Sequence, residues 1–125
     1  MLVRNSDENS EKGIVMSKVL IERIKQKIKN STGMSADKKE ELMKLLETLR
    51  SEVSSLEKTH GDSAESIAGF AGAAAHEAMR SETNPHLLQL AIDGMTSSVE
   101  EVESEHPQLV EITNSICTML SNFGI

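Results

Sequence analysis

The fold is decided by the stretch between residues 35 and 56, which reads SADKKEELMKLLETLRSEVSSL. Ser35 is a good N-cap residue, and the acidic residues that follow it favour the positive end of a helix dipole. Large apolar residues then recur at steps of four and three, which is a heptad pattern sustained over two repeats. A bundle helix and a coiled-coil seam both read this way, so we predict an amphipathic helix and treat its stripe as a candidate protein–protein interface. The stripe consists of Leu42, Leu46, Leu49, Val53 and Leu56.

Two other helices are expected around this one, before residue 31 and after residue 61. The first covers residues 17–29 and stops near Gly33, which suits the left-handed conformation that often follows a helix. The other is rich in alanine and glycine, with Asp62 or Ser63 as its N-cap. Two interpretations of it stay open. Its small side chains allow tight packing against a neighbouring helix, whereas its glycines favour a weak, partly exposed helix that frays.

The last two expected helices both begin at a proline. Asn84 is the expected cap of one, with Pro85 in its first turn, and Pro107 starts the other, which ends at Gly124. No segment shows sustained strand alternation. We therefore predict an all-α fold, an antiparallel helical bundle of four to five helices with a disordered N-terminal tail. The tail is expected over residues 1–15 and a single helical domain over residues 16–125.

Composition excludes several classes of function. The chain has no Trp, no Tyr and two Phe, so it is poorly equipped to stack on a cofactor or on bases. Its net charge of −7 disfavours nonspecific contact with nucleic acid or anionic lipid. A single cysteine rules out an internal disulfide, and no uncharged stretch is long enough to span a bilayer. We expect a cytoplasmic protein with no membrane association.

The C-terminal part of the chain carries a distinctive signature. A Glu-x-x-His-Pro-x-Leu element is followed by a helix that ends in Leu-x-x-hydrophobic-Gly-Ile. In this sequence the signature residues are Glu103, His106, Pro107, Leu109, Leu120, Phe123, Gly124 and Ile125.

This signature resembles that of a bacterial family of small helical proteins known as domain of unknown function 4404. The similarity extends from Ser17 to Ile125, and its specific part is the last thirty or so residues. Residues 62–83 look like a longer middle segment that only some members have, and Val102 departs from the Phe of many members. The resemblance implies a helical fold and a bacterial origin. It implies no activity, because the family has none established.

Candidate chemical motifs are few. The stretch from His76 to Arg80 begins like a zinc-protease helix, but the second histidine that such a site needs is replaced by Arg80. His106 is either a pH-sensitive group among carboxylates or, as we favour, part of the cap of the last helix. Cys117 is expected to be a small buried hydrophobe. We predict no catalytic residue, no metal site and no cofactor, and hence no enzyme.

The charge is divided unevenly along the chain. Residues 1–62 hold 12 basic and 11 acidic residues, whereas residues 63–125 hold one basic and nine acidic residues. The first helix carries a candidate basic face, opposed only by Glu22. It is interpreted as a solvated face, or one that docks near the acidic run of residues 100–105, in preference to a nucleic-acid-binding surface. The face consists of Lys18, Arg23, Lys25, Lys27 and Lys29.

These observations predict a structural or protein–protein interaction module that self-associates or binds a protein partner. The alternative is a weak nucleic-acid-binding protein that uses the basic face, which the acidic net charge disfavours.

Overall fold

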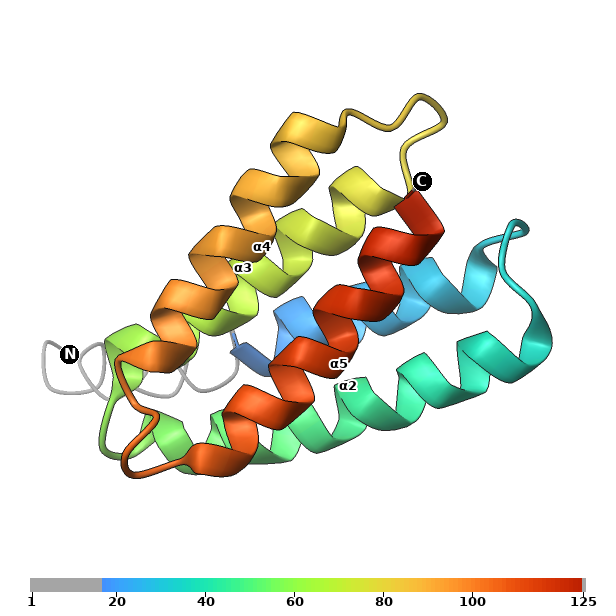
Figure 1. The fold of residues 1–125 in the computed structure, drawn as a ribbon. Helices are drawn as coiled ribbons and strands as arrows, with labels where there is room; N and C mark the ends of the chain where they lie inside the picture. The colour runs from blue at the N-terminus through green and yellow to red at the C-terminus, as the bar shows by residue number, and fades with distance from the viewer. Residues whose placement is uncertain (1–16, 125) are drawn as a thin grey trace, which may run out of the picture.

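The computed structural model describes residues 17–124, which form five helices and no strand (Figure 1). Consecutive helices run in opposite directions and are joined by short connections. The all-α antiparallel bundle is therefore confirmed, while the predicted disordered tail over residues 1–15 lies outside the described residues. The first helix covers residues 17–30, and it is followed by α2 (Ala36–Glu57), α3 (Gly61–Ala78), α4 (Pro85–Glu100) and α5 (Pro107–Gly124).

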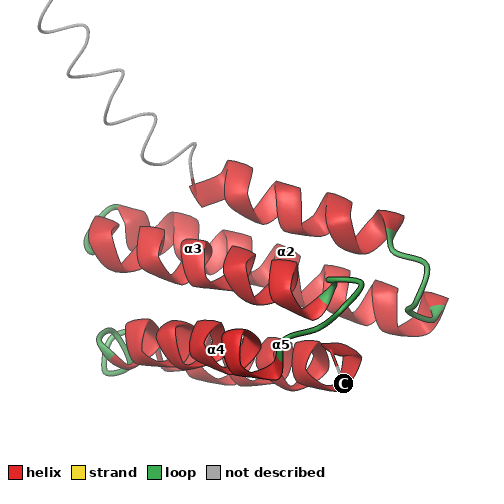
Figure 2. Ribbon diagram, turned by 90° about the horizontal axis from the view of Figure 1, so that it is seen from above, coloured by secondary structure: helices red, strands yellow, loops and turns green. Residues whose placement is uncertain are grey.

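The helices form three layers, which are seen from one side in Figure 2. The first helix makes up one outer layer, α2 and α3 the middle layer, and α4 and α5 the other outer layer. Of the pairs among α2 to α5, α3 and α4 have the most extensive contact. The first helix, α3 and α4 consequently lie next to one another along one side of the protein.

Two helix starts are as the sequence predicts. The Ser35 hydroxyl accepts a hydrogen bond from the backbone N–H of Lys38 at 3.3 Å. The Asn84 side chain accepts from the N–H groups of His86 and Leu87, at 3.0 and 3.2 Å. Both caps satisfy N–H groups that have no partner within the helix, and Pro85 occupies the position where its missing N–H costs nothing.

Two predictions about helix ends are wrong. Helix α3 begins at Gly61 with His60 as its N-cap, instead of at Asp62 or Ser63, because the His60 carbonyl already accepts from the N–H of Ala64 at 2.9 Å. Gly33 does not adopt a left-handed conformation, and no glycine in the described range has a positive φ. The first helix ends without one, because the backbone N–H of Ser31 donates to the Ile28 carbonyl at 3.1 Å.

The apolar stripe of α2 forms the centre of the core. Each of its five side chains is at most 1% exposed. Helices α3 and α5 pack on α2, and the first helix adds Ile21, Ile24 and Ile28 to the same core. The prediction of a protein–protein interface at this stripe is therefore wrong, because the chain's own helices cover it. The residues concerned are Leu42, Leu46, Leu49, Val53 and Leu56.

Helix α3 packs tightly, so the second interpretation, a weak and fraying helix, is wrong. Six of its alanines are buried, and their small side chains let the neighbouring helices approach the α3 backbone, with α4 making the most extensive contact among α2 to α5. Its glycines lie elsewhere: a Cβ atom built on Gly69 or Gly72 would meet no heavy atom within 4 Å. The buried alanines are Ala64, Ala68, Ala71, Ala74, Ala75 and Ala78.

Candidate interaction surface

Large apolar side chains that remain exposed gather on α3 and α4. Within the described residues they are Phe70, Leu87 and Leu90, with 39%, 39% and 51% of their surface exposed. Phe70 of α3 lies against Gly94 of α4, because a Cβ atom at position 94 would fall within 2.7 Å of three of its ring carbons. Leu90 and Leu87 stand about one and two turns before Gly94 on α4. Helix packing thus brings together residues that are distant in the sequence.

The exposed side of α3 continues this apolar surface towards the first helix. A shallow groove of about 300 Å³ runs between the two helices, with Gly69, Gly72 and Ala73 contributed by α3 and Leu20 and Ile24 by the first helix. Gly69 and Ala73 are exposed and stand one turn apart. We name the combined surface the apolar patch and define it as Gly69, Phe70, Ala73, Leu87 and Leu90.

The sequence contained a partial signal for this patch. Leu88, Ile92, Met95 and Val99 form the buried stripe of α4, and Leu87 and Leu90 fall outside it. Two leucines beside a complete core stripe indicate surplus apolar surface. Phe70 gave no such signal, since its exposure depends on how α3 meets α4.

The two edges of the apolar patch carry opposite charges. Arg23 and Lys27 line the groove on the first-helix side, where the Lys27 ammonium lies 3.1 Å from Nδ1 of His76. Asp93 lies at the other edge, on α4, and accepts a hydrogen bond from the Gln89 amide at 2.8 Å. Among the residues of the described range, neither Arg23 nor Asp93 has an ion-pair partner. Each edge therefore presents an unpaired charge beside apolar surface.

The predicted basic face is only partly free. Lys18, Arg23, Lys27 and Lys29 are exposed. The Lys25 ammonium instead binds carboxylates of Glu47 of α2, at 2.7 Å, and of Glu22, at 3.4 Å. The hydrogen bond to Glu47 raises the pKa of Lys25, although partial burial opposes this. The chain therefore satisfies one of the five cations internally.

A compact charge cluster surrounds Glu47. Its carboxylate accepts hydrogen bonds from the Arg50 guanidinium and from Lys25. These two bonds, first that of Arg50 and then that of Lys25, lower the pKa of Glu47 to about 2. The cluster ties the first helix to α2.

The first helix does not dock near the acidic run that follows α4. That run lies by the connection between α2 and α3, where Ser63 donates to Glu101 at 3.5 Å and Nε2 of His60 lies 3.5 Å from Glu105. The expected docking is wrong because the first helix packs on the other side of α2 and α3, in a separate layer from α4 and α5.

The signature residues near the start of α5 have structural positions. The His106 carbonyl accepts from the N–H of Leu109 at 3.0 Å, and the His106 N–H donates to Val102 at 2.8 Å. The backbone of His106 thus closes the turn before Pro107, which agrees with the cap interpretation. Leu109 is fully buried, Glu103 is exposed in the turn, and Gly124 is the last residue of α5.

The remaining candidate residues for chemistry do not come together into a site within the described residues. Arg80 forms an ion pair with Glu77 at 2.8 Å. No group of three metal-ligating side chains occurs within residues 17–124. Cys117 is buried, and its pKa is raised to about 11, first by burial and then by the negative charge of Asp93. Its thiolate is therefore disfavoured at neutral pH.

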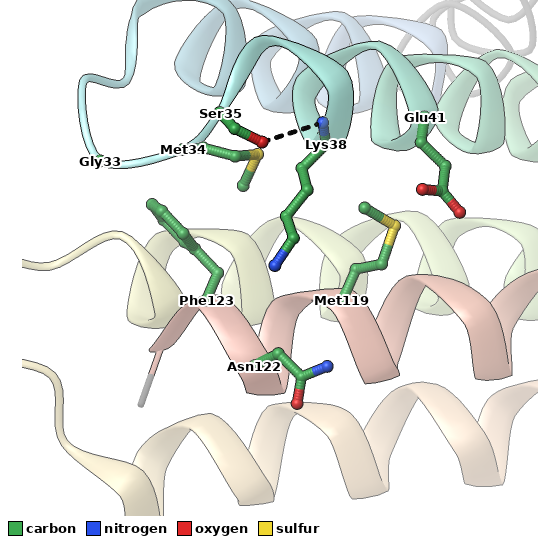
Figure 3. A pocket seen from close by; sticks show the side chains of 8 residues that line it. All are labelled: Gly33, Met34, Ser35, Lys38, Glu41, Met119, Asn122 and Phe123. Carbon is green, nitrogen blue, oxygen red and sulfur yellow. Dashed lines mark hydrogen bonds between the residues drawn. The ribbon is translucent and has the colours of Figure 1, made fainter.

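A larger cavity of about 480 Å³ lies between the start of α2 and the end of α5 (Figure 3). The Lys38 side chain extends into it between Met119 and Phe123. Glu41 is the only acidic group in the lining, which contains neither histidine nor cysteine. The hydroxyl of Ser35 also lines the cavity, but within the described residues its hydrogen bond is to the backbone N–H of Lys38 and not to a side-chain base, the pairing that covalent catalysis requires.

Comparison with known protein families assigns this chain to one of them. A family model described as "Domain of unknown function (DUF4404)" matches residues 42–125, more than half of the chain. The chain belongs to the DUF4404 family. The DUF4404 match begins in α2 and includes α3 to α5, so the whole of the first helix precedes it. A search of curated proteins and a search of solved structures give no match.

Within the described part of this DUF4404 protein, no helix combines the length and apolar character needed to cross a membrane.

Proposed function

We propose that this protein is an interaction module that acts by binding another protein through the apolar patch. The proposal rests on the exposed side chains of Phe70, Leu87 and Leu90, which lie together on α3 and α4. The apolar stripe of α2 is buried in the core and is therefore not accessible to a partner. Contiguous apolar surface with a polar rim is typical of protein–protein interaction sites. Catalysis is not part of the proposal, since Cys117 is buried with a raised pKa and the cavities lack an activated nucleophile. We also infer a bacterial origin, which rests on the family resemblance, and a cytoplasmic location, which rests on the single cysteine of the chain.

The size of the patch indicates modest affinity. Burying the exposed parts of Phe70, Leu87 and Leu90 would contribute about 2–4 kcal/mol in total. Association costs roughly 4–15 kcal/mol of translational and rotational freedom. The apolar centre alone is therefore insufficient, and the charged edges and surrounding surface must add to it.

The experiment compares proteins captured from the native cell by three forms of the full chain. The test variant carries Leu87→Gln and Leu90→Gln. The control carries Glu111→Gln and Thr118→Gln, which place the same side chains on exposed positions of α5. Wild type and control should retain the same protein, and the test variant should lose it while melting at the wild-type temperature. Equal retention by all three forms would contradict the proposal.

The exposure of four cations on the first helix supports one alternative, weak binding of nucleic acid. Glu22 and Glu47 interrupt that surface, and the net charge of −7 opposes it. A salt titration of binding to mixed-sequence DNA and RNA separates the two candidates. Absence of affinity at low salt would exclude the alternative. The cations concerned are Lys18, Arg23, Lys27 and Lys29.

A further inference from the structure

We propose that the apolar patch binds a second copy of this chain, with a twofold axis running along α3, so that Arg23 of each copy faces Asp93 of the other. The inference rests on the proposed function and deepens it by naming the partner. It follows from where the two charged edges lie relative to α3.

Arg23 and Asp93 lie on opposite sides of α3 and at nearly the same level along it. Arg23 lines the groove together with Gly72 and Ala73. Asp93 adjoins Gly94, which lies against Phe70. Positions 70 and 72–73 of α3 fall within a single helical turn. The apolar patch therefore has a basic edge and an acidic edge that are level with each other.

The two charged edges match opposite charges in a dimer only if the twofold axis runs along α3. A twofold interface uses the same surface on both copies, so an axis along α3 exchanges the two edges and sets each Arg23 opposite an Asp93. An axis across α3 would set Arg23 opposite Arg23 and Asp93 opposite Asp93. Like charges at short range disfavour that second arrangement.

The exposed side of α3 suits close contact at such an axis. Gly69 and Ala73 are exposed one turn apart, and space is open around Gly69. Small residues at this spacing let two helix backbones approach closely. Phe70 and Leu90 stand beside them on the α4 side, where they would cover the groove of the second copy. Figure 2 shows the first helix, α3 and α4 next to one another on this side of the protein.

The charges allow a stringent test by sedimentation velocity of the full chain. Wild type should be in monomer–dimer equilibrium. Arg23→Glu alone and Asp93→Arg alone should each weaken self-association about tenfold or more, because both copies then oppose like charges across the axis. Mixing the two variants should restore a dimer with one copy of each, since both contacts regain opposite charges. The combined variant should also form dimers.

The matched controls are Lys58→Glu and Glu111→Arg, which reverse exposed charges away from the apolar patch. They should dimerise as wild type does. A wild type that stays monomeric at all concentrations would overturn this inference. The proposed function would survive that result if Leu87→Gln with Leu90→Gln still abolished capture of another protein. A dimer that the single charge reversals leave intact, or that their mixture fails to restore, would also overturn the inference.

Discussion

The phenyl ring of Phe70 occupies the space that a side chain at position 94 would need. A Cβ atom on Gly94 would lie within 2.7 Å of three ring carbons, closer than real Cβ contacts. The glycine thus lets a large aromatic ring cross from α3 onto α4 while 39% of the residue stays exposed. This contact fixes one end of the apolar patch.

Replacing Gly94 by alanine should stabilise the protein by less than the gain expected from the higher helix propensity of alanine. The new methyl group displaces the Phe70 ring, which offsets a propensity gain of about 1 kcal/mol. In a Phe70→Ala background the same change should stabilise by roughly 0.5–1 kcal/mol, so urea unfolding should show a coupling of about 1 kcal/mol. Gly72→Ala is the control, because its Cβ would meet nothing within 4 Å. Equal gains from both substitutions in the wild-type background would mean that the ring does not occupy this space.

Because the α2 stripe is buried, a substitution in it should destabilise the folded chain and not act by disrupting assembly. Leu46→Ala should lower the free energy of unfolding by about 2–5 kcal/mol, because Leu46 is 1% exposed in the core. Leu90→Ala is the matched control and should cost less than about 1 kcal/mol, since Leu90 is 51% exposed. Urea titrations at two protein concentrations measure both. Similar costs for the two leucines would place Leu46 outside the core.

The cluster around Glu47 predicts a stabilisation that disappears in acid. The pKa of Glu47 is lowered from its ordinary value of 4.5 to about 2, chiefly by the hydrogen bond from Arg50. A carboxyl group with a lowered pKa stabilises the fold fully above its unfolded value, and less as the pH falls towards the folded value. Wild type should therefore exceed Glu47→Gln in stability at pH 7, and the gap should close between pH 4.5 and 2.

Urea unfolding across this pH range measures the gap. Glu41→Gln is the control, because Glu41 is exposed and has no ion-pair partner within residues 17–124. A gap of constant size from neutral to acidic pH would contradict the assignment of the hydrogen bonds to Glu47.

Cys117 should react slowly with thiol reagents in the folded protein. Its pKa of about 11 leaves little thiolate at pH 8, and burial restricts access. Absorbance with a disulfide reagent at pH 8 should show slow labelling that becomes immediate in concentrated urea. Equally fast labelling of the folded chain would mean that Cys117 is not buried in the bundle.

Local hydrogen bonds explain which parts of the fold the sequence predicted well. The caps at Ser35 and Asn84 bond to N–H groups two or three residues away, so the short sequence around each contains the whole interaction. The start of α3 was missed because the His60 backbone, which any residue could supply, accepts from Ala64. Asp62 and Ser63 are better cap residues by type, but the helix has already begun there.

The interaction surface depends on contacts between helices, which the spacing of apolar residues along the sequence does not reveal. The heptad pattern of α2 is the same whether a second chain or α3 and α5 cover it, so Leu46 and Leu49 were assigned to an interface. The apolar patch combines residues from two helices, which the extensive packing of α3 on α4, including the contact of Phe70 with Gly94, brings together. Leu87 and Leu90 beside the α4 stripe were the one visible sign.

The most direct test places a photo-reactive benzophenone amino acid at position 90 of the full chain. Leu90 has the most exposed of the three large side chains in the apolar patch, and it lies within helix α4. Irradiation should give a covalent product with the mass of two chains, and the same group at the exposed position of Thr118 on α5 should give none. No crosslink from position 90, or equal yields from positions 90 and 118, would contradict the assignment of the apolar patch as the site where a second copy binds.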